Sequence, residues 1–266
     1  MRFLPILAVV LLPLAVSAAG PDPGSYEKWR ADREASLRAP DGWLSVAGLL
    51  WLHEGENTVE LPAGASQKTI ALRLDGSKVT FEKRQLKSDI TEHPDVLTLG
   101  NVTLTIIERG GKTGVRLRDP NAETRRDFTG CKWFPADTAW RVQAKWVAYP
   151  KPKTIAITNI LGMTDQEPSP GYAEFTLQGK TMRLEPVLED GELFFMFKDA
   201  TSAKTTYGAG RFLYAGLPKG DTVELDFNKA TNPPCAFTAF ATCPLPPKQN
   251  ILTAAVDAGE KSYGKH

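Results

Sequence analysis

The sequence has few of the residues that most often build metal centres and catalytic triads. Its 266 residues include three cysteines and three histidines, and His53, His93 and His266 lie far apart along the chain. His53 and Glu54 resemble the start of the zinc-protease helix motif, but Asn57 stands where the second histidine would be. We therefore expect no metal site, and a histidine-dependent triad would have to use His53 or His93.

The sequence also lacks an excess of either charge, with 32 Lys and Arg against 31 Asp and Glu. Proteins that bind nucleic acid electrostatically need a surplus of basic residues, so we expect no nucleic-acid partner. The chain contains neither a phosphate-binding GxxxxGK[ST] loop nor a GxSxG nucleophile elbow. These absences remove the commonest nucleotide-binding and serine-hydrolase interpretations.

The one long apolar run lies at the N-terminus. Arg2 precedes an almost wholly apolar stretch from Phe3 to Val16, and small residues follow it, as signal peptidases require. The run is shorter than the roughly 20 residues that span a bilayer. No cysteine follows it, which excludes a lipoprotein anchor. The sequence predicts a Sec-type signal peptide over residues 1–19 and a periplasmic or secreted protein without a membrane span after its removal.

Glycine and proline are plentiful, at 22 and 20 residues, which suits short elements joined by turns. One helix is predicted from Ser25 to about Arg38, with an apolar stripe that covers the body of the protein. The other segments alternate apolar and polar residues, as strands do. We expect a mainly β, antiparallel sandwich or barrel-like single domain over residues 20–266, with a short N-terminal helix. The one plausible internal boundary is Tyr149–Pro152. Strands are expected at 43–52, 79–81, 96–99, 102–107, 115–118, 140–149, 154–160, 172–177, 182–184, 193–197 and 222–227.

The first cluster of candidate binding residues follows a pair of glycines at 110–111. The pair predicts a hairpin turn between two strands. Along the second strand apolar and basic residues alternate, so Arg116 and Arg118 share one face near Asp119. Guanidinium groups match the geometry of carboxylates and phosphates, which favours an anion-binding face. The alternative is a solvated face with ion pairs.

The second cluster lies between residues 197 and 212, where an aromatic strand runs into a polar loop. Its glycines allow the backbone to approach a ligand, and its side chains offer both donors and acceptors. The alternative is a long ordered turn whose side chains bond their own backbone. The candidate ligand-binding residues here are Asp199, Thr205, Tyr207 and Arg211.

The third cluster lies in a proline-rich segment from 225 to 250, which has no charge between Lys229 and Lys248. Prolines forbid regular ladders there, so we expect a packed, extended and rigid segment. Its buried polar residues would need partners within the fold. They complete the candidate ligand-binding set with Asp226, Asn228 and Asn232.

These segments carry a resemblance to a known family. The chain resembles the DUF1684 family of bacterial and archaeal proteins over nearly its whole mature length. The family name means domain of unknown function, so the resemblance implies one domain-sized unit and no particular activity. The chain departs from the family pattern at Cys131, Lys229 and Thr231, which leaves Cys235 and Cys243 as the matched pair. The stretches that carry the resemblance are Asp41–Leu44, Arg116–Pro120, Thr206–Phe212, Asp226–Asn228, Asn232–Thr238 and Ala241–Pro246.

The two matched cysteines, Cys235 and Cys243, are eight positions apart in the proline-stiffened segment. In an exported protein this spacing favours a disulfide. Two alternatives stay open: buried free thiols packed against Phe237 and Phe240, or a metal or redox pair, for which the segment holds no histidine or carboxylate. Cys131 would be the odd thiol, packed as a small apolar residue.

Three functions are compatible with the sequence. The first is an exported cell-envelope β-protein that binds a small anionic or polar ligand. The second is a hydrolase-like enzyme that uses the same polar pocket, with Asp199 or Asp226 as acid or base. In that enzyme Tyr207 would donate a proton, and Arg116 or Arg211 would stabilise an anion. The third is a structural or interaction protein. The sequence identifies no cofactor and leaves catalysis open.

Overall fold

The structure, a computed structural model, describes residues 23–264. The predicted signal peptide over residues 1–19 lies outside the described residues. The predicted fold class is confirmed: the protein is mainly β, with several antiparallel sheets and one long N-terminal helix. In the part of the chain that is described, no helix is long and apolar enough to cross a membrane.

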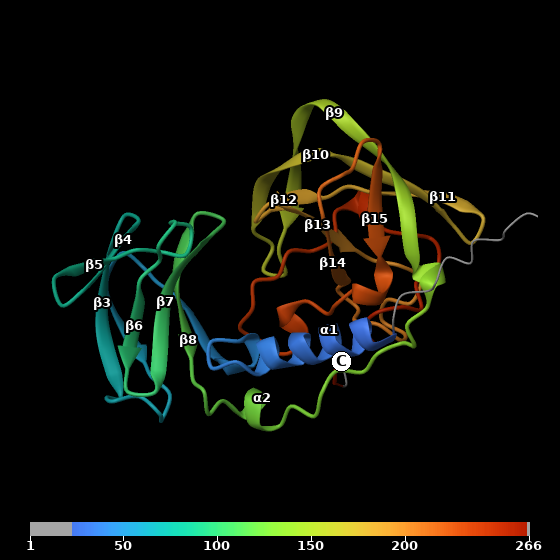
Figure 1. The fold of residues 1–266 in the computed structure, drawn as a ribbon. Helices are drawn as coiled ribbons and strands as arrows, with labels where there is room; N and C mark the ends of the chain where they lie inside the picture. Colours follow the sequence, from blue (N-terminus) through green and yellow to red (C-terminus); the bar gives the residue numbers. More distant parts are fainter. Residues whose placement is uncertain (1–22, 265–266) are drawn as a thin grey trace, which may run out of the picture.

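The strands form two lobes that lie side by side (Figure 1). Helix α1 (Pro23–Arg38) precedes them, and the short helix α2 (Glu123–Arg126) lies in the segment that connects them. The first lobe contains β1 (Val46–Trp51), β2 (Gly55–Glu60), β3 (Thr69–Asp75), β4 (Lys78–Phe81), β5 (Arg84–Leu86), β6 (Val96–Leu99), β7 (Val102–Arg109) and β8 (Lys112–Arg118). The second contains β9 (Arg141–Thr158), β10 (Thr164–Leu177), β11 (Lys180–Leu184), β12 (Val187–Glu189), β13 (Glu192–Phe197), β14 (Arg211–Ala215) and β15 (Thr222–Asp226).

The first lobe packs two four-stranded sheets against each other, in the orders β1-β8-β7-β6 and β2-β3-β4-β5. Alternate side chains of both sheets, such as Leu72, Ile106 and Val115, meet in one buried apolar cluster. The predicted hairpin is present, because β7 pairs with β8 and both Gly110 and Gly111 have positive φ, 53° and 73°. Such angles favour glycine and give a tight turn.

The second lobe joins a four-stranded sheet, β11-β10-β9-β15, to a three-stranded sheet, β12-β13-β14. Its core contains Phe195, Phe197 and Phe227, which are fully buried. Strand β9 runs through Tyr149–Pro152, so the boundary expected there is wrong. The register against β10 shifts between Ser169 and Gly171, and the prolines fall in that interruption, where no ladder hydrogen bond is lost.

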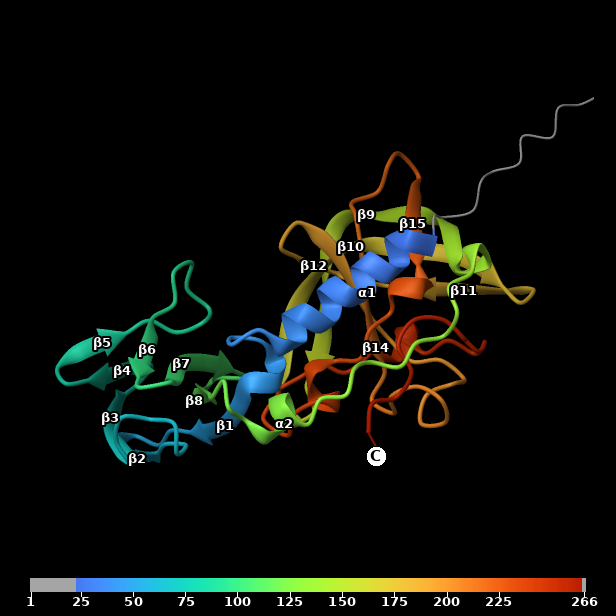
Figure 2. The ribbon, with the colours of Figure 1, turned by 60° about the horizontal axis from the view of Figure 1, so that its bottom comes forward.

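Helix α1 lies across the base of the second lobe and points its C-terminal end toward the first (Figures 1 and 2). Its buried stripe includes Tyr26 and Leu37, as the apolar stripe in the sequence predicts. The Tyr26 hydroxyl donates to Asp226 at 2.9 Å, and Arg33 pairs with Glu260 at 3.2 Å. The helix is therefore fixed to the second lobe by polar contacts as well as by packing. Each of the two lobes buries a large apolar cluster of its own. The expectation of a single domain over residues 20–266 stays a prediction.

Candidate functional site

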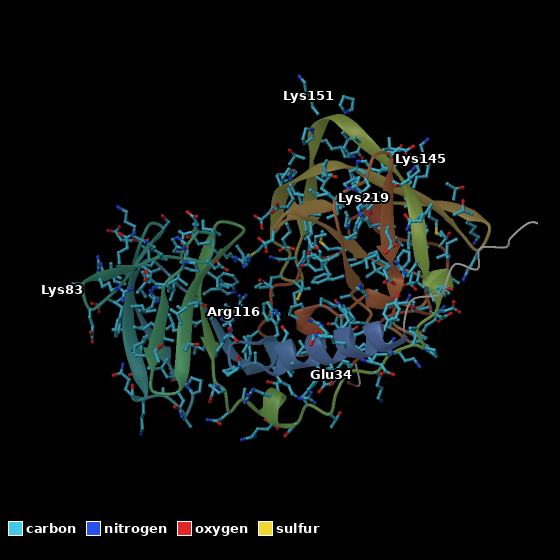
Figure 3. The ribbon with its side chains drawn as sticks, in the orientation of Figure 1. Glu34, Lys83, Arg116, Lys145, Lys151 and Lys219 are labelled. Carbon is cyan, nitrogen blue, oxygen red and sulfur yellow. The ribbon has the colours of Figure 1, made fainter. Side chains whose placement is uncertain are left out.

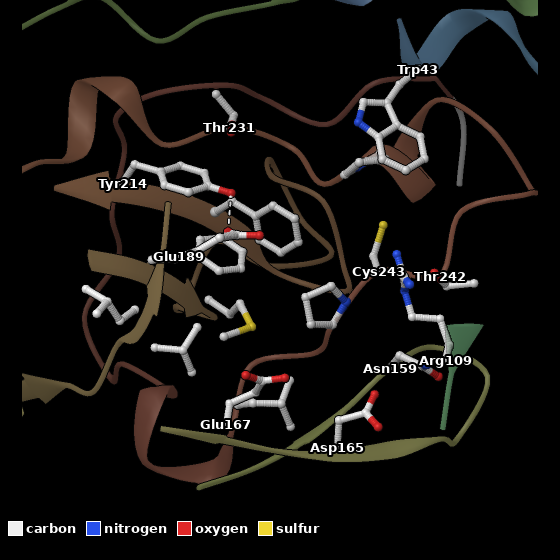
Figure 4. Close-up of a pocket in the computed structure, with 18 of the residues that line it drawn as sticks. Trp43, Arg109, Asn159, Asp165, Glu167, Glu189, Tyr214, Thr231, Thr242 and Cys243 are labelled. Carbon is white, nitrogen blue, oxygen red and sulfur yellow. Dashed lines mark hydrogen bonds between the residues drawn. The ribbon is translucent and has the colours of Figure 1, made fainter. Parts of the chain in front are cut away.

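A cavity of about 830 Å³ lies between the two lobes. The first lobe contributes Arg109 and Arg116, the turn after α1 contributes Trp43, and the second lobe contributes strands β9, β10 and β12–β14 together with the segment from 231 to 244. Figure 4 shows this cavity with Trp43 and Cys243 on one side and Glu167 and Glu189 on the other. Its volume is in the range of small-molecule sites in proteins.

Arg116 reaches this cavity because β8 alternates. Val115 and Leu117 point into the core of the first lobe, so Arg116 projects from the opposite face, between the lobes (Figure 3). The side chain is 5% exposed, and its guanidinium carbon lies 5.0 Å from the centre of the Trp43 ring. Within residues 23–264, its Nε and Nη2 atoms have no hydrogen-bond partner.

Trp43 is held in place by a tight turn at the end of α1. The Gly42 amide donates to the Ala39 carbonyl at 2.9 Å. A Cβ atom at Gly42 would lie 2.3 Å from the carbonyl oxygen of Ser36, so the turn requires glycine. This turn places the Trp43 ring within cation–π distance of the Arg116 guanidinium.

The charge on Arg116 is poorly compensated. Burial and, to a smaller extent, the neighbouring charges of Arg109 and Arg118 lower the pKa of Arg116 to about 10, against a smaller opposing effect of Asp89. The group still carries its proton at neutral pH. Arg109, by contrast, forms a two-point ion pair with Asp89, with nitrogen–oxygen distances of 2.7 and 3.0 Å. A buried cation whose Nε and Nη2 atoms have no hydrogen-bond partner among the described residues is unfavourable.

The other walls of the cavity are apolar and acidic. Val187, Phe194 and Met196 belong to a small buried cluster beside the cavity. Asp165 and Glu167 project from β10, and burial raises the pKa of Glu167, with smaller contributions from Asp165 and Glu189. No group of three His, Cys, Asp or Glu side chains among the described residues could hold a metal ion.

Among the predicted site residues, the pair in the polar loop forms a closed internal ion pair. Asp199 and Arg211 lie 2.8 Å apart and are each 1% exposed. Arg211 also donates to the carbonyls of Val256, at 2.9 Å, and Ala258. Asp199 accepts the Thr201 amide at 2.7 Å. The loop therefore has the ordered-turn arrangement, and neither Asp199 nor Arg211 lines the cavity between the lobes.

Several other predicted residues, among them Asp226, Tyr207 and Asp119, have internal partners of their own. Asp226 accepts from Tyr26 and from the Asn228 side chain at 2.9 Å, and it also borders a second cavity of about 780 Å³. Tyr207 donates to the Cys235 carbonyl at 3.2 Å. Asp119 accepts the Asn121 amide at 2.8 Å, Thr205 is exposed on a turn, and Arg118 has no partner for its Nε among the described residues.

Of the ten predicted residues, the structure brings Arg116 and Asn232 to the cavity between the lobes. Asn232 is 1% exposed, and its side-chain nitrogen donates to the Lys261 carbonyl at 2.8 Å. Its Oδ1 atom has no hydrogen-bond partner among residues 23–264. The cavity thus holds one buried donor group and one buried acceptor group that the protein itself does not satisfy.

Sequence reasoning did not identify the acidic wall of the cavity, which is formed by Asp165 and Glu167 of β10. Asp165, Glu167 and Ser169 alternate along β10, but proline and glycine residues nearby suggest a turn rather than a strand. The alternation of acids was the available signal. The stacking of Trp43 on Arg116 joins positions far apart in sequence, and no local pattern indicates it.

The two matched cysteines lie next to each other. The three cysteines are free thiols in the structure, and the Cys235 amide donates to the Cys243 Sγ at 3.0 Å. Cys243 is buried and lines the cavity, whereas Cys131 contacts the cluster around Phe128. The proximity is compatible with a disulfide and with two packed thiols, and the disulfide stays a prediction.

Comparison with known proteins gives a family without an assigned activity. The model of DUF1684, described as a protein of unknown function, matches residues 126–261, which include the whole second lobe. Two stretches that suggested the resemblance, Asp41–Leu44 and Arg116–Pro120, lie outside this match. An uncharacterised protein of Haloarcula marismortui, solved by solution NMR, is 32% identical; the alignment covers 53% of this chain and 81% of that one, with a TM-score of 0.45. No curated protein matches the chain.

Proposed function

Because the chain belongs to the DUF1684 family, described as proteins of unknown function, we propose a function from its own geometry: the protein binds a small organic anion in the cavity between its lobes. Arg116 is the group that holds the anionic end. The observation that carries this proposal is its guanidinium, 5% exposed, beside a cavity of about 830 Å³ and without hydrogen-bond partners for Nε and Nη2 among the described residues.

A carboxylate or phosphate suits this guanidinium in both charge and shape. Two oxygens can accept parallel hydrogen bonds from one edge of an arginine. The Trp43 ring lies beside this guanidinium, with its centre 5.0 Å from the guanidinium carbon. The bound anion would also neutralise a cation that the fold leaves uncompensated. Because the Arg116 side chain is 5% exposed, each of these interactions is stronger than at the surface.

The enzyme alternative draws less support from the geometry. Its proposed acid or base Asp199 is closed off by Arg211 and Thr201. Asp226 accepts hydrogen bonds from Tyr26 and Asn228, which occupy its carboxylate oxygens. Neither carboxylate lines the cavity that contains Arg116.

The binding proposal is tested by calorimetric titration of the purified protein with caproate, a simple carboxylate with an apolar tail. We expect saturable binding that is weakened at least about tenfold in Arg116→Met, because a charged hydrogen bond contributes roughly 1.5–3 kcal/mol. Arg183→Met is the matched control, since Arg183 is exposed and pairs with Glu174 outside the cavity. Absence of saturable binding, or equal binding in the two variants, would contradict the proposal.

Export remains part of this proposal. It rests on the apolar segment at residues 3–16 and on the small residues that follow it. N-terminal sequencing of protein isolated from its natural host should begin near Ala19 or Gly20. A chain that retains Met1 would show that the segment is not removed.

A further inference from the structure

The acidic wall of the cavity has a charge that the protein does not neutralise. Asp165 and Glu167 lie opposite Ile157 and Ile155 in the register of β10 and β9, so they share the face that looks into the cavity. The charges that act on Glu167 are those of Asp165 and Glu189, all of the same sign. Glu189 accepts a hydrogen bond from Tyr214 at 2.8 Å, which is neutral.

The acidic wall and Arg116 do not compensate each other. The opposite charge that acts most strongly on the Arg116 guanidinium is that of Asp89, with a smaller effect of Cys243. Conversely, no arginine is among the charges that shift the pKa of Glu167. Figure 4 shows Glu167 and Glu189 across the cavity from Trp43, the ring on which Arg116 stacks. The two charged walls are therefore separated by the cavity itself.

An independent observation calls for a donor on the ligand. Asn232 lines the cavity and is 1% exposed as a residue, and its buried Oδ1 atom has no hydrogen-bond partner among the described residues. Its amide cannot turn to satisfy this atom without losing the bond from Nδ2 to the Lys261 carbonyl. A buried acceptor left without a donor is unfavourable, so a ligand N–H group would complete it.

The surface between the charged walls is apolar. Val187, Phe194 and Met196 are buried side chains of the second lobe that line the cavity, and Ile157 continues them. Methylene groups of a ligand would be removed from water against these side chains. A single charge on the ligand would leave one of the two walls uncompensated.

Resting on the proposed anion-binding function, we propose that the ligand is a zwitterion with its charges at opposite ends of a short apolar chain. Its carboxylate or phosphate binds Arg116, and its protonated amine faces Asp165 and Glu167. The class includes ω-amino acids. It also includes lysine-like compounds, whose side-chain amine and carboxylate are separated by methylene groups. The site would then select its ligand by both charges, as separated charges of opposite sign allow.

Three probes of equal chain length separate the two ends: ε-aminocaproate has both charges, caproate has the anion and hexylamine has the cation. Calorimetric titrations at neutral pH should show ε-aminocaproate bound at least about tenfold more tightly than caproate, a preference typical of one partly buried ion pair. Hexylamine should bind more weakly than ε-aminocaproate, because it leaves Arg116 without a partner.

Variants of the acidic wall test which residues make this preference. In Glu167→Gln the ratio of the two affinities should fall toward one, while caproate binds equally well or better. Glu174→Gln is the control, because Glu174 lies on the same strand but pairs with Arg183 away from the cavity. The ratio should also fall as the pH is lowered through the raised pKa of Glu167, since its protonation removes the attraction for the amine.

The outcomes distinguish the two proposals. Equal binding of caproate and ε-aminocaproate, with both dependent on Arg116, would overturn the zwitterion and leave the anion site intact. A preference for ε-aminocaproate that persists in Glu167→Gln and Asp165→Asn would also overturn it. Failure of all three probes to bind, or binding that is indifferent to Arg116→Met, would overturn the anion site and this inference with it.

Discussion

At the scale of residues, two buried arginines have opposite roles. Arg211 is 1% exposed, but it pairs with Asp199 and donates to carbonyls of the C-terminal segment. Arg116 is 5% exposed and has a ring beside it but no hydrogen-bond partner for Nε or Nη2 within the described chain. A paired buried charge holds a fold together, whereas an unpaired one destabilises it, which agrees with the binding role proposed for Arg116.

Arg116→Met should therefore stabilise the free protein. Removing an uncompensated buried charge and replacing it with an apolar side chain of similar length raises the free energy of unfolding, by about 1–4 kcal/mol in comparable cases. Urea denaturation of the ligand-free protein measures this change. A lower free energy of unfolding than in the wild type would show that the charge already has a stabilising partner.

Arg211→Met should have the opposite effect. It leaves the Asp199 carboxylate buried without its cation and three carbonyl groups without their donor. Breaking a buried pair in this way lowers the free energy of unfolding by about 3–5 kcal/mol. The same urea denaturation applies, and a loss below that of a typical surface substitution would contradict the structural role of this pair.

At the scale of elements, α1 depends on the contact between Tyr26 and Asp226. Burial, followed by the hydrogen bond to Asp226, raises the pKa of Tyr26 from 10.0 to about 12. As the pH rises, Tyr26 therefore loses its phenol proton at a lower pH in the unfolded state than in the folded state. The free energy of unfolding should therefore be unaffected by this group below pH 10 and should fall between pH 10 and 12.

Tyr26→Phe isolates this effect, because it removes the ionisable group and keeps the ring. Its free energy of unfolding should fall less steeply than that of the wild type over the same pH interval. Denaturant titrations followed by circular dichroism measure both slopes. Equal slopes would mean that Tyr26 does not retain its proton at the base of the second lobe.

The segment from 231 to 250 contains Cys235 and Cys243, and their redox state tests whether a disulfide holds this segment in place. The Cys235 amide already donates to the Cys243 Sγ at 3.0 Å. In exported protein we expect the two thiols to be linked, with a contribution of roughly 2–3 kcal/mol to stability from closing a short loop. Peptide mapping without reductant should recover the two peptides joined. Two alkylatable thiols after unfolding would instead support the packed-thiol alternative.

Local sequence patterns predicted most of the elements. The glycine pair and the alternation along β8 were sufficient to place Arg116 on the face opposite the core. Strand β3 was predictable in the same way, because Ile70, Leu72 and Leu74 alternate strictly with exposed residues, but it was not among the expected strands. Strand β12 has three residues, too few for a periodic signal.

At the scale of the whole molecule, the candidate site exists because two lobes meet. Its cation comes from β8, its acids from β10 and its apolar wall from β12–β14. Sequence reasoning predicted Arg116 and Asn232 as binding residues but grouped them with Asp199, Arg211 and Asp226. Those three residues have hydrogen-bond partners in their own lobe or in α1, and these contacts depend on long-range packing that leaves no mark in a local pattern.

The most direct test of this account observes the Arg116 guanidinium itself. Heteronuclear NMR of the arginine Nε–H groups during a caproate titration should show a saturable shift of the Arg116 resonance, which is identified by its loss in Arg116→Met. The Nε atom of Arg211 is also buried without a partner among the described residues, but it does not line the cavity, so its resonance should stay in place. An Arg116 resonance that is unmoved by caproate, or that moves no more than that of Arg211, would contradict anion binding between the lobes.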